Sequence, residues 1–265
     1  MTDEPATVAP AVDQDWLELP SGISGSQYEV NTLYVGSERN YTYLYDTKNY
    51  HPLWAAYPLS SSHMGSLTRP DDWDYNPQFS SNLQPDLRKR SYTDTDTYSR
   101  GHVIPNASRN GIREMQLQTF YVTNSVPQIQ NNFNSGIWSS LESALQSEAK
   151  TETIYIVTGS VLNMVGESKT VKYTTPKDDT SQKCAIPNYF YKVALKVNTS
   201  GGKVTSASAI GFWFEHKTYN DNYANYAVSV DQIEQWTGFD FFVNLPDSVE
   251  NAAETNQNWS SFQSF

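Results

Sequence analysis

The sequence has almost no cysteine, no long apolar run and little positive charge. Its single cysteine, Cys184, excludes an internal disulfide framework and a cysteine-rich zinc site. Because no apolar run reaches roughly 18 residues, no membrane-spanning helix is predicted. Lys and Arg number 18 against 29 Asp and Glu, and the net charge of −11 argues against a protein that coats nucleic acid non-specifically.

The few positive residues are unevenly distributed along the chain. Seven of the 18 Lys and Arg fall between Arg69 and Arg113, and none follows Asp240. An acidic chain with this distribution can still hold a local basic cleft, so an enzyme that acts on a polyanion is not excluded.

The pattern of apolar residues predicts a domain rich in β structure, which the 18 Tyr and seven Trp also favour. A helix is predicted over 137–150, and a second begins at the N-cap Ser229, with Gln232 completing a capping box and Gly238 ending it. Residues 60–98 form a long polar excursion of the kind that is usually functional. Strands are expected at 27–34, 41–45, 54–59, 120–122, 153–161, 189–197 and 207–214.

The chain shows no internal repeat and no low-complexity linker, so one domain is expected over 21–265. The polar, proline-containing start predicts a disordered tail over 1–20. One cysteine among many Asn, Ser and Thr suits an exported bacterial protein. We therefore expect a secreted, periplasmic or surface-anchored protein whose export signal is absent from this chain.

The first motif with chemical content is Ser99-Arg100-Gly101-His102. Histidine is the side chain best suited to accept a proton near neutral pH, and Arg100 places a fixed positive charge beside it. Phosphodiester hydrolysis needs a base for water and positive charge for the phosphorane. The alternative is a structural histidine at a turn beside a surface arginine.

The second group comprises Thr123 to Gln128 and the segment from Asn134 to Glu142. If a helix begins near Asn134, then Asn134, Trp138 and Glu142 lie along one side of it. The Asn134 amide oxygen is a hard ligand that Mg²⁺ accepts, and Glu142 can hold waters of the ion. Trp138 is better explained as a core residue. The alternative is an Asn-rich capped loop before an ordinary amphipathic helix.

Together these segments resemble the DNA/RNA non-specific endonucleases. The matching blocks are Arg100-Gly101-His102, Thr123-Asn124-Ser125-Val126-Pro127-Gln128 and the Asn-x-Gly-x-Trp-x-x-Leu-Glu pattern from Asn134 to Glu142. Their order and spacing also match the family, and the similarity continues from about Tyr28 to Pro246. The resemblance implies an α+β fold with a central antiparallel sheet, flanking helices and a ββα-metal catalytic unit.

The resemblance also implies a role for each matching residue. His102 would be the general base, and Asn134 the single direct protein ligand of Mg²⁺, with Mn²⁺ as an alternative ion. Arg100 would position the phosphate, Glu142 would hold water on the metal, and Asn124 would support the site. Arg69 is similar in position to an upstream arginine that stabilises the phosphorane, although a plain surface arginine is the alternative. The expected activity is hydrolysis of DNA and RNA to 5′-phosphate ends.

One residue departs from the family pattern. The family motif begins with Asp, and this chain has Ser99. Serine can replace a hydrogen-bonding role but not a negative charge. Two alternatives therefore stay open: a catalytically impaired homologue that binds nucleic acid or a protein, and a phosphodiesterase that acts on another substrate.

The remaining reactive side chains fit no other catalytic pattern. The other three histidines, His51, His63 and His216, have no metal-ligand spacing and are interpreted as structural or surface residues. Cys184 has no partner histidine pattern, and Ser160 lacks the Gly-x-Ser-x-Gly context of a serine hydrolase.

Overall fold

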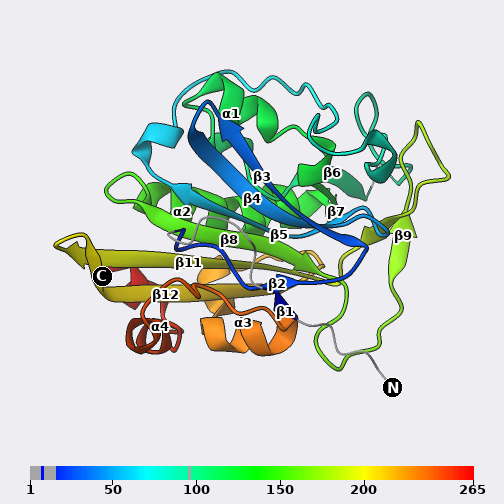
Figure 1. Ribbon diagram of the computed structural model, residues 1–265. Helices are drawn as coiled ribbons and strands as arrows, with labels where there is room; N and C mark the ends of the chain where they lie inside the picture. The colour runs from blue at the N-terminus through cyan, green and yellow to red at the C-terminus, as the bar shows by residue number, and fades with distance from the viewer. Residues whose placement is uncertain (1–6, 9–15, 95–96) are drawn as a thin grey trace.

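A seven-stranded antiparallel sheet forms the centre of the computed structural model, which describes residues 7–8, 16–94 and 97–265 (Figure 1). The strand order is β13-β12-β11-β8-β5-β4-β3. In chain order these strands are β3 (Tyr28–Val35), β4 (Glu38–Asp46), β5 (His51–Leu59), β8 (Ile154–Val161), β11 (Tyr189–Ser200), β12 (Lys203–Glu215) and β13 (Ala227–Val228).

The sheet separates two apolar cores because successive side chains of a strand point to opposite faces. In β4, Tyr43 and Tyr45 are buried in the core on one face, whereas Leu44 between them is buried in the core on the other. The same alternation places Ala55 and Trp54 of β5 on opposite faces. Six of the predicted strand segments coincide with strands of this sheet, because the alternation that defines them is local.

Helices cover both faces of the sheet. Figure 1 shows α1 (Arg113–Gln118) and α2 (Ser139–Glu148) on one side, and α3 (Val230–Thr237) and α4 (Asp247–Ala253) on the other. The last helix, α5 (Trp259–Gln263), buries Trp259 and Phe262 in the core on the α2 side. The predicted α+β fold with a central antiparallel sheet and flanking helices is confirmed. No helix among the described residues is long and apolar enough to cross a bilayer.

The predicted ββα unit is also present. Strand β6 (Tyr98–His102) pairs antiparallel with β7 (Ser125–Ile129), and α2 follows β7 through an irregular helical segment, Gln130–Trp138. Two further small sheets pair β1 (Thr7–Val8) with β2 (Gly22–Ile23) and β9 (Lys172–Thr174) with β10 (Cys184–Ile186).

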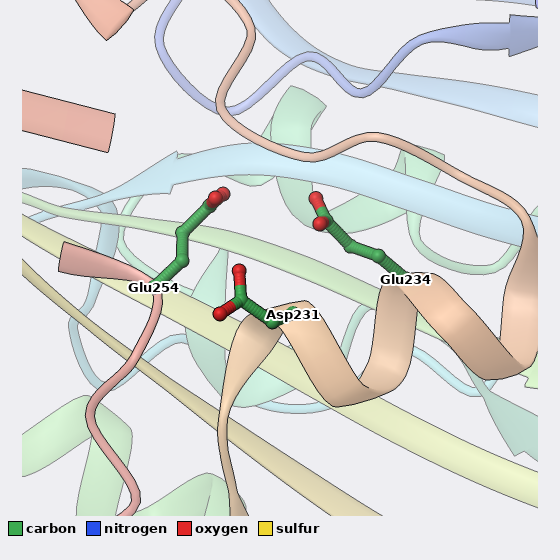
Figure 2. Close-up of side chains that lie close together, drawn as sticks. All are labelled: Asp231, Glu234 and Glu254. Atoms are coloured by element: carbon green, nitrogen blue, oxygen red, sulfur yellow. The ribbon is translucent and has the colours of Figure 1, made fainter. Parts of the chain in front are cut away.

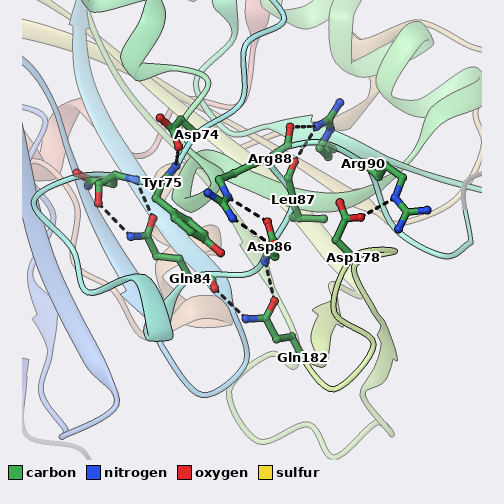
Figure 3. Close-up of polar contacts among 11 residues, drawn as sticks. Asp74, Tyr75, Gln84, Asp86, Leu87, Arg88, Arg90, Asp178 and Gln182 are labelled. Atoms are coloured by element: carbon green, nitrogen blue, oxygen red, sulfur yellow. Dashed lines mark hydrogen bonds and ion pairs between the residues drawn. The ribbon is translucent and has the colours of Figure 1, made fainter.

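The long excursion over 60–98 contains two short 3₁₀ turns and no strand of the described part before β6. It nevertheless has a core of its own, in which Trp73, Leu87 and Tyr92 pack with Phe120 and Cys184. Figure 3 shows its polar side, where Arg88 meets Asp86 and Arg90 meets Asp178. This packing gives a loop without regular structure the rigidity needed to form a wall of a site.

One predicted strand is wrong, whereas the helix predicted over 137–150 is confirmed as α2 and only its conditional extension back to Asn134 is absent. Residues 120–122 do not form a strand: the chain turns there, makes a single bridge between Asp74 and Tyr121, and continues as a 3₁₀ turn over Val122–Asn124. The 137–150 helix does not start near Asn134 either, because Gly136 has φ −128° and ψ −111°, outside helical values. Asn134 therefore precedes α2 and does not share a regular helix with Glu142.

Both ends of the chain pack more than their polar composition suggests. The predicted tail over 1–20 falls mostly on residues 1–6 and 9–15, which lie outside the described residues, but Leu19 and Glu18 are buried and Glu18 pairs with Arg39. A single domain over 21–265 stays a prediction.

The N-cap of α3 is confirmed, since Ser229 accepts a hydrogen bond from the Gln232 amide, and Gly238 ends the helix at φ 75°.

Candidate active site

A cleft of about 480 Å³ opens between the long loop, the end of β6 and the start of α2. Five of the six predicted site residues line it, and only Asn124 does not. The cleft is lined by Arg69, Trp73, Ser99, Arg100, His102, Pro105, Asn106, Ala107, Gln130, Asn134, Ser139 and Glu142. The structure thus brings together residues that are as far as 73 positions apart in the sequence, from Arg69 to Glu142.

His102 is the last residue of β6, and its ring packs against two aromatic rings that also contact each other. The ring centroids of Trp73 and Phe120 lie 4.7 and 4.8 Å from that of His102. Its Nε2 atom is buried without a hydrogen-bond partner, which leaves Nδ1 as the nitrogen that can meet a water in the cleft. Burial lowers the pKa of His102 to about 3, and the charges of Arg69 and Arg100 contribute. The ring is therefore neutral at pH 7, which is the protonation state that a general base requires.

The two arginines of the cleft are anchored differently. Arg100 donates from Nη1 to the Leu87 carbonyl oxygen at 2.7 Å, and its guanidinium lies 4.9 Å from the Trp73 ring centroid. Arg69 is half exposed and lies 5.0 Å from the Phe120 ring centroid. An anchored arginine and a half-exposed one suit a phosphate whose charge grows during reaction. The alternative of Arg69 as an ordinary surface arginine is not favoured, since it lines the same cleft as His102.

Asn134 presents its amide oxygen to the cleft because its amide nitrogen is already engaged. Nδ2 donates to Ser99 Oγ at 3.1 Å and to Gln130 Oε1 at 3.2 Å. Ser99 Oγ in turn donates to the Gln128 carbonyl oxygen at 3.2 Å. Serine at this position therefore acts as a neutral hydrogen-bond acceptor that orients Asn134, where the family motif has a carboxylate.

Glu142 enters the cleft from the first turn of α2, and a buried lysine lies behind it. Lys192 of β11 is 1% exposed, its Nζ lies 3.6 Å from Glu142 Oε1, and it donates to Thr158 Oγ1 at 2.9 Å. Burial raises the pKa of Glu142, an effect that the nearby positive charge opposes, and burial lowers the pKa of Lys192 to about 8. A signal for this lysine is present in the sequence, because Lys192 lies among the apolar residues at the start of β11.

Asn124 supports the cleft from outside it. Its side chain accepts a hydrogen bond from the Ile104 amide at 3.0 Å and donates to the Ile104 and Thr119 carbonyl oxygens at 3.0 and 2.8 Å. The Val103 amide also donates to the Asn124 carbonyl oxygen at 3.0 Å. Asn124 thereby fixes the backbone that follows His102, which is a positioning function.

The donor set in the cleft fits a hard divalent cation. It consists of the free Asn134 amide oxygen and the Glu142 carboxylate, with no thiol or second imidazole among the lining residues. Mg²⁺ keeps several waters and takes few protein ligands, so one amide oxygen and one nearby carboxylate are compatible with it. Zn²⁺, which prefers nitrogen and sulfur ligands, fits poorly.

The remaining candidate groups are structural, as expected. His51 Nε2 lies 3.0 Å from the Ser160 carbonyl oxygen, and His216 Nδ1 lies 2.8 Å from that of Pro187. Cys184 is fully buried, and burial raises the pKa of its thiol beyond the physiological range. Trp73, which stacks on His102 and Arg100, is the aromatic residue of the cleft that the sequence did not single out.

Comparison with known proteins agrees with this site. The family model for DNA/RNA non-specific endonucleases matches residues 23–248. A nuclease of Nostoc sp. is 26% identical over 254 residues, covering 89% of this chain and 82% of that protein. The mitochondrial endonuclease G of Caenorhabditis elegans is 31% identical over 169 residues, covering 59% of this chain and 52% of that protein, so the chain spans about half of that relative.

A solved structure shares the fold. The crystal structure of an EndoG/EndoGI complex superimposes with a TM-score of 0.64, at 21% identity, over 82% of this chain and 88% of that one. The family model spans most of the chain. The cleft unites the first and third motif blocks that carried the resemblance, and Asn124 of the second block supports it from outside. The chain is a nuclease and belongs to the DNA/RNA non-specific endonuclease family.

Proposed function

We propose that this chain is a metal-dependent, sugar-nonspecific endonuclease that hydrolyses DNA and RNA to 5′-phosphate ends. The observation that carries the proposal is the convergence of His102, two arginines, Asn134 and Glu142 on one cleft. The cleft holds a neutral base, fixed positive charge and oxygen ligands, which phosphodiester hydrolysis requires.

In the proposed mechanism the base acts first. His102 removes a proton from a water through Nδ1, and the water attacks phosphorus in line. Arg100 and Arg69 stabilise the negative charge that develops on the phosphorane oxygens. Asn134 would hold Mg²⁺ or Mn²⁺ through its amide oxygen, and Glu142 would orient the ion's waters. When bound, the ion neutralises charge on the phosphate and on the leaving 3′ oxygen.

Substrate contacts favour low sequence specificity. The charged and polar side chains of the cleft suit phosphate oxygens, which carry no base information. The alternative of a catalytically impaired homologue rests on Ser99, but Ser99 retains the hydrogen bond that orients Asn134. An active enzyme is therefore the better explanation.

The test is cleavage of supercoiled plasmid and of single-stranded RNA in Mg²⁺ buffer by the native chain and by His102→Ala. Cleavage should be lost in the variant and in EDTA, and the products should be ligatable through their 5′-phosphates. His51→Gln is the matched control, a histidine substitution at a residue that does not line the cleft, and it should retain activity at pH 7. If the native chain bound but did not cleave either substrate with Mg²⁺ or Mn²⁺, the impaired homologue would be the correct reading. Cleavage of only a small diester would favour a phosphodiesterase instead.

We also propose that the protein acts outside the bacterial cytoplasm, in the periplasm, at the surface or in the medium. The support is composition, with one fully buried cysteine in a chain rich in Asn, Ser and Thr. Fractionation of the source cells with an antibody would test it, and a signal confined to the cytoplasm would contradict it.

A further inference from the structure

Three carboxylates converge on the face of the molecule opposite the cleft. Asp231 and Glu234 lie on α3, and Glu254 follows the last residue of α4. One oxygen from each side chain lies within 4.8 Å of the others, and Figure 2 shows the three carboxylates pointing toward one another. We call these three residues the acidic triad.

Helix geometry and backbone hydrogen bonds place the three side chains of the acidic triad close together without a ligand. Positions three apart share a face of a helix, which aligns Asp231 with Glu234. The Val230 amide donates to the Glu254 carbonyl oxygen at 2.9 Å and so ties the start of α3 to the end of α4. The Phe241 amide donates to Glu234 Oε1 at 2.8 Å and fixes that side chain, which leaves Oε2 free.

Glu254 has no partner that could explain its burial. The residue is 4% exposed, and its Oε1 atom is buried without a hydrogen bond. Within residues 7–8, 16–94 and 97–265, no lysine or arginine forms an ion pair with any member of the triad. A buried carboxylate without donor or counter-ion is strongly unfavourable, so a positive group or a proton must balance it.

The surroundings of the triad add negative charge. Burial raises the pKa of Glu254 to about 9, and the charges of Glu234, Glu250, Asp231 and Asp240 add to this effect. Burial likewise raises the pKa of Glu234 to about 7. Protonation is therefore one way of balancing the site, and a bound cation is the other.

We propose that the acidic triad is a binding site for a hard divalent cation, with Ca²⁺ as the metal it fits best. Ca²⁺ takes carboxylate oxygens at about 2.3–2.6 Å, so oxygens on opposite sides of the ion lie roughly 4.6–5.2 Å apart. The three oxygens of the triad all lie within 4.8 Å of one another, so they are close enough to share one ion. Two members are only partly buried, so waters can complete the coordination. With no imidazole or thiol in the cluster, a zinc site is not indicated.

The cation would clamp α3 to the end of α4. Through Ile233 and Ala253, both helices pack on the sheet face that carries Leu44 and Trp54, whereas the cleft lies on the α2 side. Its function would be structural, and the proposal does not depend on the nuclease mechanism.

The experiment is calorimetric titration of the EDTA-stripped full chain with CaCl₂, using Asn134→Ala as the background. That substitution removes the proposed ligand of the cleft, so binding that remains reports a second site. We expect one Ca²⁺ per chain, and at about a hundredfold excess over Kd a rise in Tm of roughly 5 °C or more. Adding Glu254→Gln, which keeps the shape of the side chain, should weaken binding about tenfold or more. Asp231→Asn is a second, more exposed variant that should do the same.

Two results would overturn the proposal. One is an Asn134→Ala chain that binds no Ca²⁺ at millimolar concentration while its Tm rises on acidification, which would mean that protons balance the triad. The other is Ca²⁺ binding that is unchanged by both triad variants. Neither result depends on whether the chain cleaves nucleic acid, so failure here and failure of the nuclease proposal are distinguishable.

Discussion

The glycine between Arg100 and His102 is a position where one added methyl group should disturb both the packing and the catalytic histidine. A Cβ at Gly101 would lie 2.2 Å from Gln128 Oε1 and 2.5 Å from Gln128 Cβ. Ordinary contact begins at 3.4 Å, so β6 and β7 would have to separate by about 1 Å. The amide end of Gln128 can swing away, but its Cβ moves only with the backbone.

We therefore expect Gly101→Ala to cost about 1–3 kcal/mol of unfolding free energy, the usual range for an overpacked core. Because His102 is the next residue, a shift of this size should also reduce kcat/KM roughly 100-fold. Urea denaturation and initial rates on a fluorogenic oligonucleotide measure the two effects separately.

A double-mutant cycle between positions 101 and 128 tests whether the contact with Gln128 causes the loss of stability. All three of the closest contacts belong to the Gln128 side chain, so Gln128→Gly should relieve most of the cost of Gly101→Ala. Gln128→Ala keeps the Cβ at 2.5 Å and should relieve much less, which makes it the matched control. If Gly101→Ala changed stability by less than about 0.5 kcal/mol, or if Ala at 128 relieved as much as Gly, this reasoning would be refuted.

Three further predictions concern hydrogen bonding and charge. Ser99→Ala removes the hydrogen-bond acceptor that orients Asn134 and should lower kcat/KM about two- to tenfold. Ser99→Asp keeps an acceptor and should match or exceed the native kcat/KM, and equal kcat/KM values for the alanine variant and the native chain would contradict this. Arg69→Gln removes a charge that helps to lower the pKa of His102, so the acid limb of the kcat/KM–pH profile should move to higher pH, and an unmoved limb would contradict it. Burial lowers the pKa of His51 to about 4. Between about pH 6.5 and 4 the histidine is therefore protonated in the unfolded state but not in the folded state, so the free energy of unfolding falls by up to about 3 kcal/mol as the pH is lowered. Urea denaturation at pH 7 and 4.5 should show a smaller loss for His51→Gln, and an equal loss would rule out this histidine as a cause.

Most of the fold was predictable because its signals are local. Alternating apolar residues mark strands such as β4, and the Ser229 cap and Gly238 mark the ends of α3 within a single turn. The break between Asn134 and α2 was not predictable, because it depends on the backbone angles of Gly136, which the residue type permits but does not specify. The failed strand at 120–122 has a similar origin. Apolar Val122 suggests a strand, but the backbone there forms local turns, in which the Tyr121 amide donates to the Gln118 carbonyl oxygen and the Asn124 amide donates to that of Tyr121.

The candidate site was predictable as a set of residue types, whereas its organisation was not. The histidine, arginine and asparagine motifs are contiguous and can be read directly. The contact between Ser99 and Asn134 joins positions 35 apart, and the one between Lys192 and Glu142 joins a strand to a helix. Such contacts depend on tertiary packing, which no local pattern contains.

An acidic chain can bind an anionic substrate because positive charges line its cleft and the acidic triad lies away from it. Among the described residues that line the cleft, only Arg69 and Arg100 are positively charged, and the acidic triad lies on the far face of the sheet. A helix is about 10 Å across and the Debye length at physiological salt is about 8 Å, so the far acids are largely screened from the cleft. Two phosphate contacts predict a slope of about −2 for log K against log salt, far shallower than a DNA-coating protein shows. Binding of a short duplex to His102→Ala in EDTA, from 50 to 300 mM salt, would measure it, and a slope of −5 or steeper would show that the substrate contacts basic residues beyond the cleft.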